Sequence, residues 1–335
     1  MLSNQIATSN IKMKTYQQLW QSLTPLYDAG EAQAIVRTVL DVKYGMTLTD
    51  IICGKVNELS ADEGRKLEEI IIRLQKGEPV QYVLGEADFA GRTFHVEPGV
   101  LIPRPETAEL CQWIEEDMAG KSTVSSEDFS EDSPLATDDA RLILDICTGS
   151  GCIAITLGLN IPNSEVTGWD ISEDALRIAQ GNVEMLKARN VRIEYQDALA
   201  LQKAAETDNE KMKVNDDKEV VKPKGEAKTP STQKWDLIVS NPPYICEKEK
   251  ADMEKNVLEH EPSLALFVPD EDPLKFYRAI AEYASSALKS GGALYFEINP
   301  IYEKETREML LKLDFKDIET KEDAFGKKRM MRAIK

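Results

Sequence analysis

The sequence predicts an α/β fold with a mostly parallel sheet covered by helices on both faces, preceded by a small helical domain. Beyond residue 140, short apolar strands alternate with helical segments, and a glycine-rich turn follows the first of these strands. Such alternation is typical of parallel sheets joined by crossover helices. The composition also changes along the chain. Residues 14–76 carry apolar side chains at helical spacing, whereas residues 77–110 are rich in Gly, Pro and aromatic residues.

The N-terminal segment carries the start and stop signals of helices. Ser60 and Glu63 form a capping-box pattern, in which each side chain accepts a hydrogen bond from the backbone amide of the other residue. Apolar residues follow this box at helical spacing, and an earlier apolar run with the same spacing stops near Gly45. We therefore expect a helical domain over residues 1–76.

A β-hairpin is expected after this domain. The spans that contain Phe89 and Phe94 are short, and Gly91 lies between them where a tight turn is needed. We expect the hairpin to belong to a linker over residues 77–106 that joins the helical domain to a second domain over residues 107–335.

The second domain is expected to alternate strands with helices. Its apolar runs are too short for long helices and are separated by segments with helical spacing. Ligands of such sheets bind at the carboxyl ends of the strands. The expected strands are 142–145, 166–170, 191–195, 235–240 and 293–298, and the expected helices are 107–118, 153–159, 173–188 and 273–288.

Two polar segments interrupt the second domain, at about residues 121–140 and 201–234. The first is rich in Ser, Asp and Glu, and the second in Lys and Glu. Structureless loops of this length are unusual inside a compact domain, so we expect solvated insertions without a catalytic role. Deleting residues 203–232 is expected to leave activity largely intact.

The composition excludes several classes of protein. The 335 residues include 59 Asp and Glu against 41 Lys and Arg, a net charge of −18. Binding by neutralisation of phosphates needs a basic surplus, so we expect no direct DNA binding and no membrane binding. Five cysteines without metal-ligand spacing and two histidines indicate a reduced, cytoplasmic compartment and no metal site. No apolar run is long enough to span a membrane, and the first residues lack a signal-peptide pattern.

The first chemical motif is Asp-Ile-Cys-Thr-Gly-Ser-Gly at residues 145–151, where a strand leads through a glycine-rich turn into a helix. The glycines allow close approach of the backbone to a ligand, and the helix start offers free amides. Asp170, at the end of the next strand, has two oxygens that can accept both hydroxyls of a ribose. The glycine spacing also fits a dinucleotide-binding turn, and a tight turn without a ligand needs glycine too.

The second motif is Asn-Pro-Pro-Tyr at residues 241–244, directly after the apolar strand 235–240. Two prolines stiffen the backbone and remove competing N–H donors. Asn241 can offer its side-chain oxygen and Pro242 its carbonyl to the two hydrogens of an incoming NH2 group, with the Tyr244 ring against its flat face. A dehydrogenase does not require this arrangement, so the motif favours a planar amide or amino substrate.

Together these motifs resemble those of class I S-adenosylmethionine-dependent methyltransferases that act on planar nitrogens. The resemblance covers about residues 14–332 without the two insertions. Further segments narrow it to the HemK-like release-factor glutamine N5-methyltransferases: Gly77-Glu-Pro-Val-Gln-Tyr82, Phe89-Ala-Gly-Arg-Thr-Phe94, Leu101-Ile-Pro-Arg-Pro-Glu-Thr107, Glu261-Pro-Ser-Leu-Ala-Leu266 and Phe276-Tyr-Arg278.

The resemblance implies an α/β fold, namely a Rossmann-like class I methyltransferase domain with a small N-terminal helical domain joined by a β-hairpin. It implies transfer of a methyl group from S-adenosyl-L-methionine to the side-chain amide nitrogen (N5) of a glutamine. That glutamine would lie in the Gly-Gly-Gln motif of class I peptide chain release factors, so the reaction would support translation termination. The helical domain would recognise the substrate.

The resemblance also implies residue roles. The loop 147–151 would hold the methionine end of the cofactor, Asp170 the ribose hydroxyls, and Asp197 with Ala198 would border the adenine. The implied cofactor-binding residues are Asp145, Cys147, Thr148, Gly149, Ser150, Gly151, Asp170, Asp197, Ala198 and Asn241. The implied catalytic residues, which would hold the substrate glutamine, are Asn241, Pro242, Pro243 and Tyr244.

Four features depart from the family pattern. Cys147 stands where many methyltransferases have the first glycine, and Ala198 offers no aromatic ring beside the adenine. Pro269-Asp-Glu-Asp-Pro-Leu274 replaces a more glycine-rich turn, and Asn299 stands where a glycine is common. These departures concern the shape of the loops and not the reaction.

Other activities stay open on the sequence alone. A glutamine of a ribosomal protein is the nearest alternative substrate, since the same active-site motif serves it. An adenine N6-methyltransferase on DNA or RNA would share Asn-Pro-Pro-Tyr but predicts a basic surface with aromatic residues, which the acidic charge opposes. A cofactor-binding protein without catalysis would not need the intact motif. The sequence indicates no obligatory general base.

Overall fold

The computed structural model describes residues 14–120, 140–201 and 234–335. The chain divides into two compact units. The first unit comprises Met1–Glu86 and Glu254–His260, and the second comprises Ala87–Met253 and Glu261–Lys335. The domain boundary expected at residue 76 stays a prediction, whereas this division lies at Glu86. The two expected insertions fall almost wholly outside the described residues.

The first unit is helical, and its apolar core is formed by side chains from residues 19–84. Ser60 Oγ accepts from Glu63 N at 3.3 Å, and Glu63 Oε2 accepts from Ser60 N at 2.8 Å, which confirms the capping box. Gly45 ends its helix in the left-handed conformation at φ 61°, also as expected. The helices are α1 (Tyr16–Gln21), α2 (Ala29–Tyr44), α3 (Leu48–Ile52), the 3-10 helix η1 (Lys55–Glu58), α4 (Ala61–Leu74), α5 (Val80–Leu84) and α10 (Lys255–His260).

The expected hairpin is present as β1 (Glu86–Phe89) and β2 (Arg92–His95). Its two turn residues, Ala90 and Gly91, have φ values of 48° and 75°. Two successive left-handed residues form the kind of tight turn whose twist matches that of the flanking strands. The short helix α5 lies within the linker expected over residues 77–106.

The second unit contains a seven-stranded sheet with the order β10-β11-β9-β6-β3-β4-β5. Strands β3, β4, β5, β6 and β9 run parallel to one another, and β11 runs antiparallel to both of its neighbours, β9 and β10. All five expected strands are confirmed. The strands are β3 (Arg141–Ile146), β4 (Ser164–Asp170), β5 (Val191–Tyr195), β6 (Trp235–Ser240), β9 (Leu288–Glu297), β10 (Lys316–Glu322) and β11 (Lys328–Ile334).

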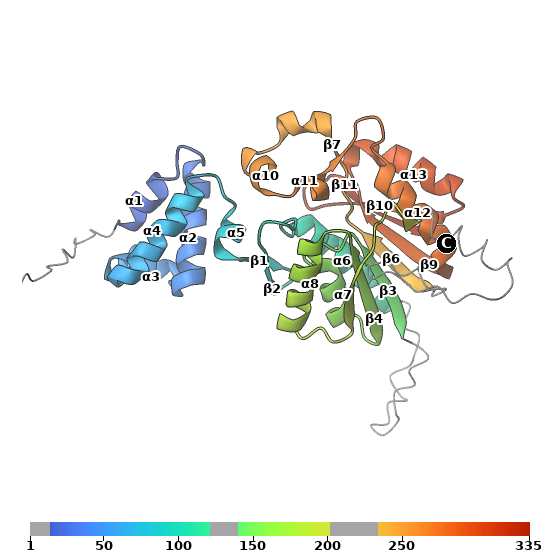
Figure 1. Cartoon of the computed structure of the whole chain (residues 1–335), viewed down its shortest axis with the longest axis horizontal. Helices are drawn as coiled ribbons and strands as arrows, with labels where there is room; N and C mark the ends of the chain where they lie inside the picture. Colours follow the sequence, from blue (N-terminus) through green and yellow to red (C-terminus); the bar gives the residue numbers. More distant parts are fainter. Residues whose placement is uncertain (1–13, 121–139, 202–233) are drawn as a thin grey trace, which may run out of the picture. The chain divides into compact units, whose positions relative to one another are not determined.

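Helices cover both faces of this sheet (Figure 1). Residues of α6 (Pro105–Gly120), α7 (Cys152–Asn160) and α8 (Glu173–Met185) share one buried cluster with the strands. Residues of α12 (Lys275–Ala287) and α13 (Glu303–Lys312) share the other. The remaining short elements are β7 (Ile245–Cys246), η3 (Glu247–Asp252), α11 (Ser263–Leu266), β8 (Phe267–Val268) and η4 (Pro300–Tyr302).

The strand order positions the site. From β3 the chain continues through β4 and β5 on one side of the sheet and through β6 and β9 on the other. The order of the strands reverses between β3 and β6, because the chain leaves β3 toward β4 on one side and leaves β6 toward β9 on the other. Parallel sheets bind ligands in the crevice at such a point. In the described part of the chain, no helix is long and apolar enough to cross a membrane.

Candidate active site

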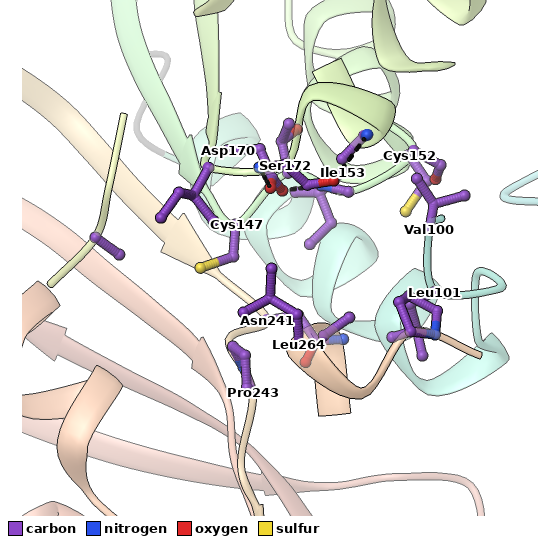
Figure 2. A pocket seen from close by; sticks show the side chains of 18 of the residues that line it. Val100, Leu101, Cys147, Cys152, Ile153, Asp170, Ser172, Asn241, Pro243 and Leu264 are labelled. Carbon is purple, nitrogen blue, oxygen red and sulfur yellow. Dashed lines mark hydrogen bonds between the residues drawn. The ribbon is translucent and has the colours of Figure 1, made fainter. Parts of the chain in front are cut away.

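A pocket opens at the carboxyl ends of the parallel strands, within the second unit. Most of the site residues named from the sequence line it (Figure 2). Cys147 lies between Asp170 and Asn241 in this view. The expected residues that line the pocket are Cys147, Thr148, Gly149, Ser150, Asp170, Asp197, Ala198, Asn241 and Pro243. Four others, Asp145, Gly151, Pro242 and Tyr244, are not among the lining residues.

The loop after β3 is held in a sharp turn by left-handed residues. Cys147, Gly149 and Gly151 have φ values of 63°, 55° and 80°. At Gly149 an added Cβ would meet no atom within 4 Å, so glycine is favoured there by the backbone conformation and not by lack of space. At Gly151 it would lie 3.2 Å from the Cβ of Ala179 in α8, so this glycine also permits close packing behind the pocket.

Asp145 lies behind the loop and not in the pocket wall. Its Oδ2 accepts from Thr148 Oγ1 at 2.6 Å and from Ala154 N at 3.2 Å, so the carboxylate ties the loop to the start of α7. The side chain is fully buried, and burial raises the pKa of Asp145 to about 7. Its Oδ1 is buried and has no hydrogen-bond partner among the described residues. A buried oxygen of this kind calls for a donor from a ligand or water.

Asp170 faces the pocket from the end of β4. Its Oδ2 accepts from Gly149 N and its Oδ1 from Ser172 N, both at 2.9 Å. Burial raises the pKa of the Asp170 carboxyl, and backbone amide donors, foremost those of Ser172 and Gly149, oppose that rise. A carboxylate has about four acceptor positions, so each oxygen can still accept one further hydrogen bond. The amides therefore fix the carboxylate in place and still leave it able to accept hydrogen bonds from a ligand.

Residues after β5 complete this side of the pocket. Gln196 N donates to the carbonyl oxygen of Asp170 at 2.9 Å, which holds the ends of β4 and β5 together. Asp197 Oδ1 accepts from Leu199 N at 2.8 Å, and Ala198 is buried in the wall. Gln196 lines the pocket as well and was not singled out from the sequence.

The Asn-Pro-Pro-Tyr segment is anchored by a buried carboxylate that the sequence analysis did not assign to the site. Asn241 Nδ2 donates to Glu297 Oε2 at 3.0 Å and to Thr107 Oγ1 at 3.1 Å. Tyr244 donates its hydroxyl to Glu297 Oε1 at 3.0 Å. Tyr244 packs against the second buried cluster and is not among the residues that line the pocket. The expected contact of its ring with a bound group stays a prediction.

Glu297 and Thr107 are the site residues that sequence reasoning missed. Glu297 ends the apolar strand β9 and is only 2% exposed. The sequence signal that could have identified Glu297 is an acidic residue at the carboxyl end of a buried parallel strand, because such strand ends converge on the pocket. Thr107 lies in the first turn of α6, close to Pro103 and Arg104 of the pocket wall.

Arg104 forms an ion pair with the buried carboxylate of Glu261, which also accepts from Ile102 N at 3.2 Å.

The conformation of Cys147 gives a test of strain in the loop. Left-handed φ costs a non-glycine residue roughly 1–2 kcal/mol. We expect Cys147→Gly to be more stable than Cys147→Ala by about 1 kcal/mol, since both remove the thiol and only glycine removes the conformational penalty. Chemical denaturation of the two variants measures the difference. Equal stabilities, or a more stable alanine variant, would contradict it.

The comparisons with known proteins agree with this geometry. Residues 137–309 match the family described as methyltransferase domain, and residues 24–85 match the PrmC N-terminal domain. A release factor glutamine methyltransferase of Bacteroides thetaiotaomicron is 44% identical over 313 residues, which cover 93% of this chain and 96% of that protein. One of Flavobacterium psychrophilum is 36% identical, over 96% of this chain and 98% of that protein.

The chain belongs to the release factor glutamine methyltransferase family. The match extends over nearly the full length of these relatives, so it includes both the helical first unit and the methyltransferase domain. A relative of Bacillus subtilis with the same name is 32% identical, over 96% of this chain. The α/β, Rossmann-like methyltransferase fold expected from the sequence is confirmed. Within residues 14–120, 140–201 and 234–335, no group of three or more His, Cys, Asp or Glu side chains is placed to hold a metal ion.

Proposed function

We propose that this protein transfers a methyl group from S-adenosyl-L-methionine to N5 of the glutamine in the Gly-Gly-Gln motif of class I release factors. Membership of the family supports the reaction and the class of substrate. The observation that carries the proposal is the orientation of Asn241. Its NH2 group is engaged by Glu297 and Thr107, so its carbonyl oxygen is the atom left to accept a hydrogen bond in the pocket.

The residues of the pocket fit the cofactor. The methionine end of the cofactor would lie against the backbone of the loop 147–151, which Asp145 ties to the start of α7 from behind the pocket wall. Asp170 retains acceptor capacity for ribose hydroxyls, and Asp197 and Ala198 would border the adenine. When bound, the cofactor would supply an activated methyl group on a sulfonium.

The chain's part in the reaction is to position the nitrogen. An amide nitrogen is a weak nucleophile, because its lone pair is delocalised into the carbonyl. Asn241 Oδ1 and the carbonyl of Pro242 would accept the two N–H bonds of the glutamine amide and orient its nitrogen. These acceptors also stabilise positive charge that develops on the nitrogen. Positioning of this kind supplies up to roughly 7–11 kcal/mol in the best intramolecular cases.

We also assign roles to the rest of the molecule within this proposal. The helical domain would recognise the release factor, and residues 107–335 would perform the reaction. The protein would act in the cytoplasm, where release factors function. Its five cysteines are free, which supports a reduced compartment. Neither direct DNA binding nor membrane binding is part of the proposal.

A substrate panel tests this function. We expect labelled S-adenosylmethionine and the full-length protein to label a class I release factor and not its Gly-Gly-Ala variant. Ribosomal protein and DNA, incubated separately, should remain unlabelled. Mass spectrometry of the labelled peptide should place the methyl group on the glutamine side chain. Label on DNA, or equal label on the Gly-Gly-Ala variant, would overturn the proposal, and label on ribosomal protein alone would transfer it to that substrate.

A further inference from the structure

Glu297 connects three side chains that come from separate parts of the sequence. Its Oε2 accepts from Thr107 Oγ1 at 2.6 Å and from Asn241 Nδ2 at 3.0 Å, and its Oε1 accepts from the Tyr244 hydroxyl at 3.0 Å. Both carboxylate oxygens are therefore engaged. Arg329 Nη1 lies 3.4 Å from the Tyr244 hydroxyl, and the Arg329 guanidinium also donates to the buried Asp323. A positive charge therefore lies next to the hydroxyl that donates to Glu297.

The pattern of donors determines which way the Asn241 amide faces. The Thr107 hydroxyl donates its hydrogen to Glu297, so Thr107 Oγ1 can only accept a hydrogen bond from Asn241. An ionised Glu297 also only accepts. Both neighbours therefore require the NH2 end of Asn241, and a rotated amide would place its carbonyl oxygen against two acceptors. Within the described residues, no hydrogen bond occupies Asn241 Oδ1.

The ionised form of Glu297 is favoured by its partners. The pKa of the Glu297 carboxyl lies above its ordinary value because burial raises it and the charge of Glu106 adds to the rise, whereas the hydroxyls of Thr107 and Tyr244 and the charge of Arg329 act in the opposite direction. Three donors converge on the carboxylate, and none of these groups offers it an acceptor in the observed arrangement.

We propose that Glu297 is a positioning residue of the active site, which acts with Thr107 to aim Asn241 Oδ1 at the nitrogen that receives the methyl group. This inference rests on the proposed function and deepens it. Glu297 does not line the pocket and acts through Asn241. Its loss should therefore reduce turnover, because the substrate nitrogen is held less often in line for transfer.

The first test is Glu297→Gln. A glutamine has one acceptor oxygen and one donor amide, so it cannot accept from Tyr244 and from the Thr107–Asn241 pair together. We expect kcat for release factor methylation to fall about 10- to 100-fold, with the KM for release factor and the Kd for cofactor within about 3-fold of wild type. Glu322→Gln, an exposed acid of β10, is the matched control and should retain wild-type kcat.

Thr107 provides a second pair of variants that are less disruptive. Thr107→Val has nearly the same shape but lacks the hydroxyl, and Thr107→Ser keeps it. We expect Thr107→Val to lower kcat about 3- to 10-fold and Thr107→Ser to retain at least half of it. If Glu297 acts through Asn241, adding Glu297→Gln to Asn241→Ala should change the residual rate less than about 2-fold.

The outcomes separate this inference from the proposed function. If the wild-type protein fails to methylate any release factor, the proposed function fails. If the wild-type protein is active and Glu297→Gln retains its kcat, the positioning role is overturned. It is also overturned if the Glu297→Gln and Asn241→Ala effects multiply, or if kcat falls only together with cofactor affinity and melting temperature, since that describes a structural role.

Discussion

Replacing Asn241 with alanine is expected to lower methyl transfer to a release factor at least about 100-fold, while the Kd for cofactor changes less than about 3-fold. The variant removes the side-chain acceptor that would hold the glutamine amide, and loss of one preorganised hydrogen-bonding group in an active site typically costs about 2.7–4 kcal/mol of transition-state stabilisation. It also leaves the buried Glu297 with one donor fewer. We therefore expect a lower melting temperature as well.

Single-turnover transfer of labelled methyl groups measures the first effect, and isothermal titration with cofactor measures the second. Asn160→Ala is a matched control, because Asn160 is exposed at the end of α7 away from the glycine loop. Its activity should equal that of wild type. Transfer by Asn241→Ala at more than about one tenth of the wild-type rate would show that the side chain of Asn241 is not the principal clamp.

Replacing Asp170 with alanine is expected to weaken cofactor binding at least about 30-fold. The carboxylate holds the amides of Gly149 and Ser172, so the variant loses both the proposed acceptor for ribose and the support of the glycine loop. A hydrogen bond to a charged group contributes about 1.5–3 kcal/mol, and two such losses are enough for this change. When the cofactor is saturating, the kcat of Asp170→Ala should lie closer to the wild-type value than its cofactor affinity does.

Equilibrium titration and the dependence of rate on cofactor concentration distinguish these two effects. Asp88→Ala, which removes an exposed aspartate of β1, serves as the control and should bind cofactor as wild type does. An Asp170→Ala variant that binds cofactor with a Kd within 3-fold of wild type would exclude Asp170 from the cofactor site.

The sequence was sufficient for the five parallel strands β3, β4, β5, β6 and β9 but not for the end of the sheet formed by β10 and β11. The five strands were predictable because short apolar runs followed by turns alternate with helical segments. Strand β10 has a mostly exposed, charged face and pairs only with β11, so its apolar content is too low to predict a strand. Its position depends on pairing with β11, which a local pattern does not contain.

The candidate site divides in the same way. The glycine loop and Asp170 were predictable, because chain order and strand ends place them in one crevice. The partners of Asn241 were not, since Thr107 lies 134 residues before it and Glu297 lies 56 residues after it. The local motif also did not indicate that the Tyr244 hydroxyl would donate to Glu297, a residue 53 positions later in the chain.

Cys147 has a consequence for chemical selectivity. The pocket wall contains a thiol, and a thiolate is a much stronger nucleophile than an amide nitrogen toward an alkylating sulfonium. Burial raises the pKa of Cys147 well above its ordinary value, and the neighbouring carboxylates of Asp170 and Asp145 raise it further. The sulfur is therefore uncharged at neutral pH. Burial, together with the Asp170 carboxylate that would hold the methyl donor, thus keeps this thiol in its weakly nucleophilic form.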